Sequence, residues 1–240
     1  MKKLVVFGDS FQSTSYIIPG THWSEILSVR NGLELINLAN AGCSTRYIVF
    51  QILHAMLIDN CIVVGSHAAH PSRVELLTKE HFVDHSLIDI RSFENFYDAE
   101  DNDGRENAFL KTLNLFTILS DDSVPAEDKT FLMTKLSTGL FEHIDRWGIF
   151  YALSKLKSAN KDFVYLANLL PQSTLIEDFE LVNAFGKKHI MTIDELNFND
   201  YYVDKHATPG FFDPGYHTSP NSQFIIADKI EKKLKDNGLL

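Results

Sequence analysis

A serine follows a glycine and an acid where a short apolar segment ends near the N-terminus. The segment reads VVFGDSFQS over residues 5–13, and its apolar residues stop at Gly8. In open parallel sheets, ligands bind beyond the carboxyl ends of the strands, so a turn at Gly8 would put Asp9 and Ser10 beside such a site. The Ser10 hydroxyl is then a candidate nucleophile, and its backbone N–H is a candidate donor to an oxyanion. The other interpretation is that Asp9 or Ser10 only caps a short helix.

A nucleophilic serine needs a base, and a loop near the C-terminus that contains Pro and Gly supplies one. The segment GFFDPGYHTSPNSQFIIADKI has Asp213 and His217 directly before an amphipathic stretch. An imidazole at His217 can take the Ser10 proton and pass it to a leaving group, and the Asp213 carboxylate can orient the ring. Asp204 and His206, in YVDKHATPG, form a second acid–histidine pair that ranks below the first.

Three blocks of the chain, in this order, resemble the SGNH (GDSL-like) hydrolases over nearly its whole length. They are FGDSF near the N-terminus, NLANAGCST after the second apolar segment, and the Asp-to-His pair before the last helix. The resemblance implies that Ser10 is the nucleophile, that the Gly42 N–H is an oxyanion donor, and that His217 and Asp213 are the base and its orienting acid. It further implies a flavodoxin-like fold, no cofactor, and hydrolysis of a carboxylic ester through an acyl-enzyme on Ser10. The expected substrate is a small molecule or a carbohydrate that carries a short acyl group.

The chain departs from the family pattern at two places. The block after the third strand normally reads Gly-x-Asn-Asp, whereas here Gly65 is followed by Ser66, His67 and Ala68. An imidazole N–H at His67 can still donate to an oxyanion, so His67 joins Ser10 and Gly42 as an oxyanion candidate. The acid and the base are also separated by three residues in place of two, which a bulge in the Pro-Gly loop would accommodate. These departures leave a second interpretation open, a catalytically inactive binding or assembly domain that has kept the fold.

Other polar residues near this edge have less specific interpretations. Arg73, in HPSRVE, would lie near the mouth of the site, where a structural ion pair is its ordinary role. The scattered histidines do not form the tight set of ligands that a metal site requires, so no metal is expected; they are His54, His67, His70 and His81. A phosphate-binding role for the Gly8 turn lacks a Gly-rich fingerprint and a P-loop lysine.

Five short apolar segments alternate with segments of helical periodicity, which indicates parallel strands joined by crossover helices. The expected strands are residues 3–7, 33–38, 61–64, 163–167 and 189–192, and the expected helices are 22–30, 45–58, 175–185 and 222–234. The better of these strands are dense in Val, Ile and Leu without alternation, so we expect those strands to be buried on both faces. The pattern predicts a three-layer α/β/α sandwich around a mainly parallel five-stranded sheet.

The stretch from about residue 72 to 158 is longer than a crossover needs. Its centre, YDAEDNDGREN, is acidic, and residues 107–119 and 129–157 carry apolar residues at helical spacing. We therefore predict one domain over residues 1–240, with a mainly helical insertion at about 72–158 that shapes or covers the substrate pocket.

The composition is that of an ordinary globular protein, with 45% hydrophobic and 22% charged residues. A formal net charge of −10 argues against a nucleic-acid partner and against an anionic membrane. No apolar stretch has the length of a membrane span or of a signal peptide, which predicts a cytoplasmic protein, and a phage-encoded origin would suit a divergent family member. The two cysteines, Cys43 and Cys61, are expected to be free and buried. Nothing in the sequence indicates an oligomeric state.

Overall fold

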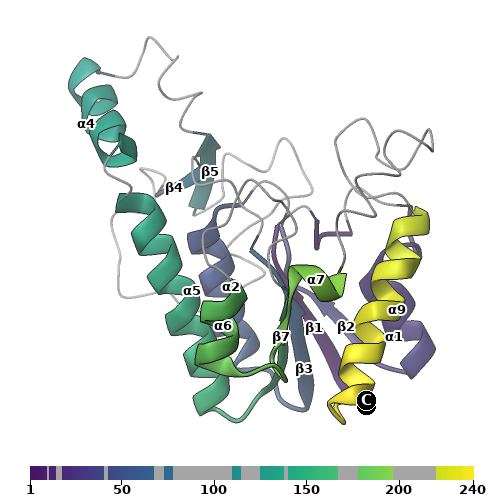
Figure 1. The fold of residues 1–240 in the computed structure, drawn as a ribbon. Helices are drawn as coiled ribbons and strands as arrows, with labels where there is room; N and C mark the ends of the chain where they lie inside the picture. The colour runs from purple at the N-terminus through teal and green to yellow at the C-terminus, as the bar shows by residue number, and fades with distance from the viewer. Residues whose placement is uncertain are drawn as a thin grey trace.

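A sheet of five parallel strands runs through the middle of the protein (Figure 1). In this computed structural model the described residues are 1–9, 11–14, 18–40, 43–67, 73–77, 110–114, 125–137, 140–166, 178–196 and 220–240. The strands are β1 (Lys3–Phe7), β2 (Glu34–Asn37), β3 (Cys61–Gly65), β6 (Asp162–Leu166) and β7 (Ile190–Met191), and their spatial order is β2-β1-β3-β6-β7. Each expected strand is confirmed to within one residue of its predicted bounds.

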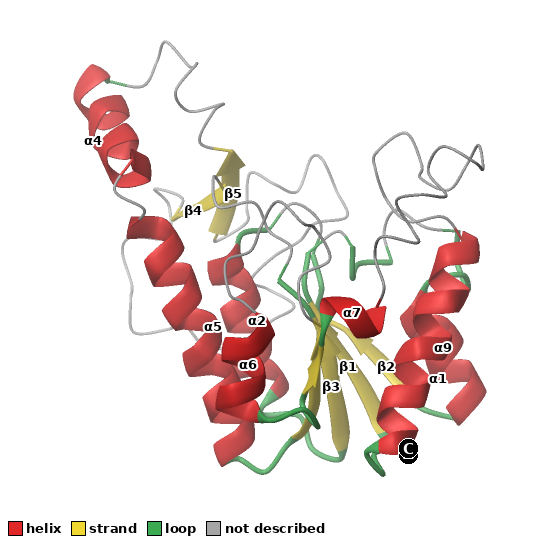
Figure 2. Ribbon diagram, viewed as in Figure 1, coloured by secondary structure: helices red, strands yellow, loops and turns green. Residues whose placement is uncertain are grey.

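Helices cover both faces of this sheet, which gives three layers (Figure 2). On one face lie α1 (Trp23–Asn31) and α9 (Pro220–Asp236), and on the other lie α2 (Thr45–Ala55), α5 (Leu140–Ser158) and α6 (Asp178–Phe185). Alternate strand residues enter the two cores, so that Val5 packs with α2 and α5, whereas Leu4 and Val6 pack with α1 and α9. The predicted α/β/α sandwich is confirmed; β1, β3, β6 and β7 are buried, whereas the edge strand β2 is only partly buried.

Capping residues set the ends of the first two helices. The ring of His22 accepts a hydrogen bond from the Ser24 N–H, and the Glu25 carboxylate accepts one from the His22 N–H, which forms a capping box at the start of α1. The Ser44 hydroxyl oxygen accepts from the backbone N–H groups of the first turn of α2. The expected helix over 22–30 is confirmed, and the one expected over 45–58 ends three residues early, at Ala55.

The region between β3 and β6 contains two strands as well as helices. β4 (Arg73–Leu77) pairs antiparallel with β5 (Leu110–Asn114), so the helix expected over 107–119 is wrong. The local apolar spacing does not show a pairing with a strand more than thirty residues earlier, and that pairing decides the structure. The helices expected within 129–157 are confirmed as α4 (Ala126–Ser137) and α5. That the chain is one domain with an insertion at about 72–158 stays a prediction.

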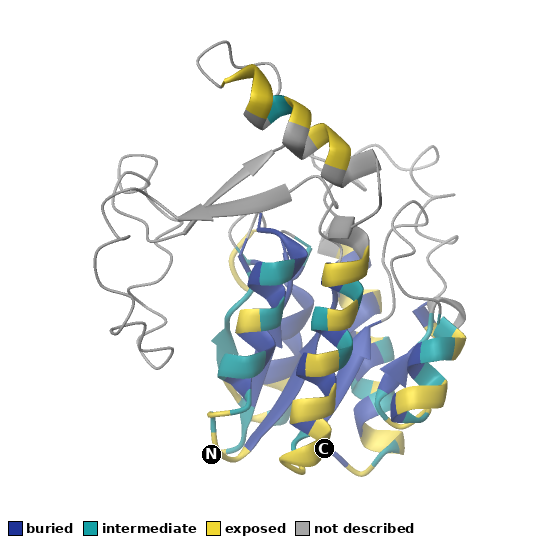
Figure 3. Cartoon of the chain, turned by 90° about the vertical axis from the view of Figure 1, so that its left-hand side faces the viewer, coloured by how far each residue is buried: buried dark blue, intermediate teal, exposed yellow. Residues whose placement is uncertain are grey.

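Burial follows the layers (Figure 3). The strands β1, β3 and β6 are almost wholly buried, whereas most of the described side chains of α4 are exposed. The short helix α7 (Ile193–Leu196) follows β7 and contacts α9. Within the described ranges, no helix combines the length and the apolar character that a membrane span requires.

Candidate active site at the carboxyl edge of the sheet

The strand order reverses between β1 and β3. From β1 the chain passes to β2 on one side, whereas β3, β6 and β7 follow one another outward on the other side. In open parallel sheets, this switch point is where ligands bind, beyond the carboxyl ends of the strands. Gly8 and Asp9 follow β1 there, and Ser66 and His67 follow β3. Two of the sequence blocks that predicted chemistry therefore flank the switch point.

Gln12, in the segment after β1, is bonded to the last residue of β2, to the segment after β3 and to α1. Its Nε2 donates to Ser66 Oγ at 2.8 Å, and its Oε1 accepts from Trp23 Nε1 at 2.9 Å. Its backbone carbonyl accepts from Asn37 Nδ2 at 2.9 Å, and its side chain is buried. Gly8 makes room for it, because a Cβ at Gly8 would lie 2.4 Å from the Cγ of Gln12. Gln12 was not predicted as a site residue from the sequence. The only indication of such a role was a polar residue two positions after the candidate nucleophile.

The backbone of Gly8 is bonded directly to the second block. Its carbonyl accepts from the Asn40 N–H at 3.1 Å and from the Cys43 thiol at 3.5 Å. Its N–H donates to Oε1 of Gln51, a fully buried residue of α2, at 2.7 Å. Gln51 was also missed, although a polar residue in the apolar helix TRYIVFQILHA is a signal that its side chain is needed inside. These bonds hold the first and second blocks against each other.

Asp9 shapes the turn after β1. Its Oδ1 accepts from the Phe11 N–H at 3.0 Å, and its carbonyl accepts from the N–H groups of Gln12 and Ser13, both at 3.0 Å. The residue is buried. These contacts give Asp9 a structural role in the turn after β1. Its alternative interpretation was the cap of a short helix, and the described residues 11–14 form a turn and not a helix.

His67 lies directly beyond β3 and is buried. Its ring stacks on Tyr165, with centroids 5.6 Å apart and planes inclined by 18°, and its Nδ1 shares a hydrogen bond with the Tyr165 hydroxyl. Burial lowers the pKa of His67 to about 4, so the ring is neutral near pH 7. Nε2 is buried and has no hydrogen-bond partner within the described part of the chain. A buried ring nitrogen without a partner at this edge is available to a ligand.

A second polar atom of this kind lies on the loop after β2. Asn40 is buried, and its Oδ1 has no hydrogen-bond partner among the residues that the structure describes. Its backbone N–H is the one bonded to Gly8, so the side chain belongs to the same edge of the sheet. The carboxyl edge thus carries a ring nitrogen on one loop and an amide oxygen on another for which the described residues offer no partner.

Several predicted site residues lie outside the described residues: Ser10, Gly42, Asp213 and His217, together with the second pair, Asp204 and His206. Arg73 belongs to β4, and its side chain is also outside the description. The roles assigned to these residues stay predictions. As predicted, Cys43 and Cys61 are buried and are not joined in a disulfide. The described residues include no group of three or more His, Cys, Asp or Glu that could hold a metal ion.

Solved structures with the same fold cover nearly the whole chain, although no family model and no curated protein matches it. A member of the lipolytic protein G-D-S-L family from Veillonella parvula DSM 2008 is 12% identical over 97% of both chains, with a TM-score of 0.50. The psychrotrophic esterase EstA from Pseudoalteromonas sp. is 12% identical over 98% of both chains, with a TM-score of 0.50. TesA is 12% identical over 98% of this chain and 99% of its own, with a TM-score of 0.52. The fold is therefore that of the GDSL/SGNH lipolytic proteins, as the sequence blocks predicted.

Proposed function

We propose that this protein is a serine ester hydrolase in which Ser10 forms the acyl-enzyme. The observation that carries the proposal is that the first and second sequence blocks and the segment after β3 meet at the switch point of the sheet. Gly8, two residues before Ser10, is bonded to Asn40 and Cys43, which enclose Gly42 in the sequence. Gln12 binds Ser66, the neighbour of His67.

The proposed reaction has two steps. The Ser10 hydroxyl oxygen attacks the ester carbonyl while His217 takes its proton, and the alcohol leaves with that proton as the acyl-enzyme forms. A water molecule then attacks the acyl group, passing a proton to His217, and the acid is released as Ser10 regains its proton. Asp213 orients the imidazole and stabilises its charged form in both steps.

The oxyanion of each tetrahedral intermediate needs hydrogen-bond donors in place before the reaction. We assign this role to the backbone N–H groups of Ser10 and Gly42 and to Nε2 of His67. Two observations on His67 support its part: its Nε2 is buried without a described partner, and the ring is neutral near pH 7. As substrate we propose a small-molecule ester with a short acyl group, a carbohydrate ester being the specific candidate.

Phosphonate labelling tests the proposal at its nucleophile. EstA, one of the similar structures, is described as inhibited by monoethylphosphonate, so a fluorophosphonate is a suitable probe. We expect peptide mass spectrometry to find the label on Ser10, and Ser10→Ala and His217→Ala to abolish both labelling and hydrolysis of p-nitrophenyl acetate. His206→Ala serves as the matched comparison, because loss of labelling there, with labelling intact in His217→Ala, would transfer the base to the second pair.

A binding or assembly domain without catalysis is the second candidate function. The observation in its favour is the segment after the third strand, in which His67 and Ala68 stand where the family pattern has Asn and Asp. A folded wild-type protein that neither reacts with the phosphonate nor turns over the ester would overturn the hydrolase proposal. Glycan binding would then be measured on the same sample.

A further inference from the structure

The hydroxyl of Tyr165 is a partner of His67 that the sequence did not reveal. Tyr165 belongs to β6, where it pairs in register with Gly65 of β3, and its side chain is completely buried. Its ring stacks on His67 on one contact and on Phe7 on another, the Phe7 centroid being 6.3 Å away. The phenol is therefore fixed in position, with its hydroxyl on Nδ1 of His67.

The direction of this hydrogen bond decides which ring nitrogen of His67 carries the proton. A neutral imidazole has one N–H donor and one acceptor nitrogen. If Tyr165 donates, Nδ1 accepts, the proton is on Nε2, and a single donor is left without a partner. If Nδ1–H donates instead, both the Tyr165 O–H and the acceptor lone pair of Nε2 are left unpaired in the buried site. Because unpaired buried polar groups are costly, the first arrangement is favoured.

A histidine needs such a partner where an asparagine would not. The side-chain amide of asparagine carries N–H donors in every state, whereas a given imidazole nitrogen is a donor in only one of the two neutral tautomers. Replacing asparagine by His67 therefore retains an oxyanion donor only if something fixes the tautomer. Burial, which lowers the pKa of His67 to about 4, keeps the ring neutral but does not choose between the tautomers.

We propose that Tyr165 is a positioning residue that holds His67 in the tautomer with the proton on Nε2, which makes this N–H available to the oxyanion. The assignment of the oxyanion as its partner rests on the proposed esterase function, whereas the tautomer itself does not. The two parts are therefore tested by separate measurements.

The tautomer is measured by NMR on protein labelled with ¹⁵N in its histidine rings. Long-range ¹H–¹⁵N correlations distinguish a protonated from an accepting nitrogen, and His67→Asn identifies the signals of residue 67. At pH 7 we expect Nε2 protonated and Nδ1 accepting in the wild-type protein. In Tyr165→Phe, which keeps the stacked ring, we expect a mixture of tautomers. Tyr151→Phe, which removes an exposed hydroxyl from α5, is the control and should leave the signals unchanged.

The contribution to catalysis is measured by a double-mutant cycle on ester hydrolysis. Tyr165→Phe should lower kcat about three- to tenfold, the worth of one hydrogen bond, with KM nearly unchanged. In the His67→Asn background the same substitution should have no further effect on kcat, because an asparagine donor needs no tautomer. A purely structural role for Tyr165 would lower kcat equally in both backgrounds, and that result would overturn the proposal.

The wild-type spectrum, with the signals of residue 67 identified by His67→Asn, tests the proposal even if Tyr165→Phe does not fold. A proton on Nδ1 of His67 would overturn it, as would signals that Tyr165→Phe does not change. Absence of ester turnover in the wild-type protein would overturn the proposed function instead, and the spectrum would still show whether Tyr165 sets the tautomer.

Discussion

Gly65 lies between Phe7 and Tyr165 in the sheet, and the rings of these two residues approach each other across it. Phe7 of β1 and Tyr165 of β6 lie on the two strands that flank β3, and each pairs in register with Gly65. Their ring centroids are nevertheless only 6.3 Å apart. A Cβ at Gly65 would lie 2.0 Å from the Phe7 carbonyl oxygen and 2.7 Å from its Cγ. The backbone oxygen cannot move aside as the end of a flexible side chain could, so the glycine is required for this packing.

Gly65→Ala is therefore expected to destabilise the protein strongly. Overpacking in a core costs about 1–3 kcal/mol, and the contact with backbone places this substitution at or above about 3 kcal/mol. Urea denaturation followed by circular dichroism measures the change. Gly148→Ala in α5 is the matched control, because its Cβ would meet only a side-chain atom of Val49, at 3.0 Å, and alanine favours the helix. Equal stability of Gly65→Ala and wild type would contradict the packing argument.

Some residues of the candidate site could be predicted from the sequence, whereas the residues that hold them in position could not. His67 was predicted as a donor; it is buried, and its Nε2 has no hydrogen-bond partner among the described residues. Gln12 and Tyr165 were missed, because each acts through a side chain that meets a partner 54 or 98 positions away. Such contacts depend on the order of the strands in the sheet, which local spacing does not encode.

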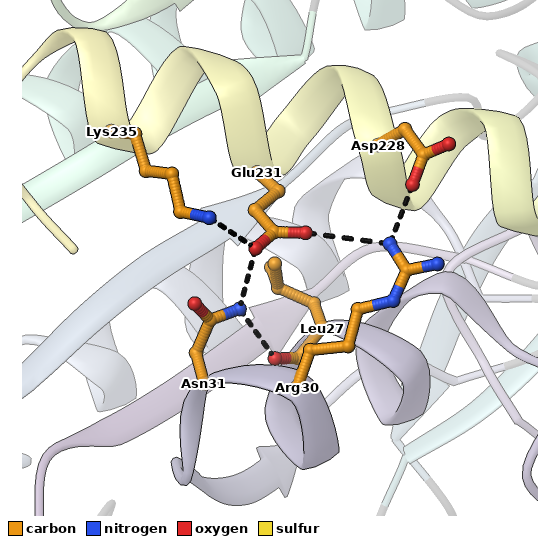
Figure 4. Close-up of polar contacts among 6 residues, drawn as sticks. All are labelled: Leu27, Arg30, Asn31, Asp228, Glu231 and Lys235. Carbon is orange, nitrogen blue, oxygen red and sulfur yellow. Dashed lines mark hydrogen bonds and ion pairs between the residues drawn. The ribbon is translucent and has the colours of Figure 1, made fainter.

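Helices α1 and α9, which run in the same direction, are joined at the surface by a cluster of polar and charged side chains around Glu231 (Figure 4). Its Oε1 accepts from Lys235 Nζ at 2.6 Å and from Asn31 Nδ2 at 3.3 Å, and its Oε2 accepts from Arg30 at 3.4 Å. Only 15% of the Glu231 side chain is exposed, against 64% for Asp228, the other partner of Arg30. Glu231 is therefore the member of the cluster that links the two helices while its carboxylate is largely shielded from water.

Glu231→Gln should lower the stability of the protein by about 1 kcal/mol near neutral pH, because three donors lose their charged acceptor. The hydrogen bond from Lys235 is the foremost cause that holds the pKa of Glu231 below its ordinary value. A lowered carboxylate pKa stabilises the fold above the unfolded pKa, and this contribution is lost as the pH falls. The difference in Tm between variant and wild type should accordingly shrink in acid.

Asp236→Asn is the control for this experiment. Asp236 pairs with Lys232 within α9 and is well exposed, so its loss should cost about 0.3 kcal/mol or less. If both substitutions lowered Tm by the same amount, the contacts of Glu231 between α1 and α9 would contribute no more to stability than an exposed ion pair within one helix.

Helices and strands could be predicted where burial requires a pattern of apolar residues in the sequence. They could not be predicted where pairing with a distant segment determines the secondary structure. The strands β1, β3 and β6 are buried on both faces, and their apolar runs fixed them to within one residue. In β5 the residues LKTLN fit more than one spacing, and the antiparallel backbone pairing with β4 decides that they form a strand.

For the whole molecule, the strand order brings together segments that are far apart in the sequence. At the switch point between β1 and β3, the bonds of Gly8 and Gln12 join the first sequence block to the second and to the segment after β3. The order of alternating strands and helices predicted the fold class and this edge. It could not predict the hydrogen bonds between the blocks, because they depend on the side chains of Gln12 and Gln51 entering the interior.

Two buried neutral histidines make the stability of the whole protein sensitive to acid. Burial, the larger effect, lowers the pKa of His22 to about 4, although a hydrogen bond to the Phe11 carbonyl opposes the shift, and burial lowers that of His67 to about 4 as well. In His22 the Nδ1 accepts from the Ser24 N–H, so a proton there would break the cap of α1. The ordinary pKa of 6.5 applies in the unfolded chain, so below pH 6.5 the unfolded state binds more protons than the folded state.

Stability must therefore fall as the pH decreases from 6.5 to 4. Each histidine should account for a loss of about 2 kcal/mol at pH 5 and about 3 kcal/mol below pH 4. Urea denaturation at pH 7, 6, 5 and 4.5 measures the slope, and His22→Asn, which can still cap α1, and His67→Asn should each make it shallower. His143→Asn, which changes an exposed side chain of α5, is the control. A wild-type slope that neither buried-site substitution reduces would show that these two rings take up their protons without opening the fold.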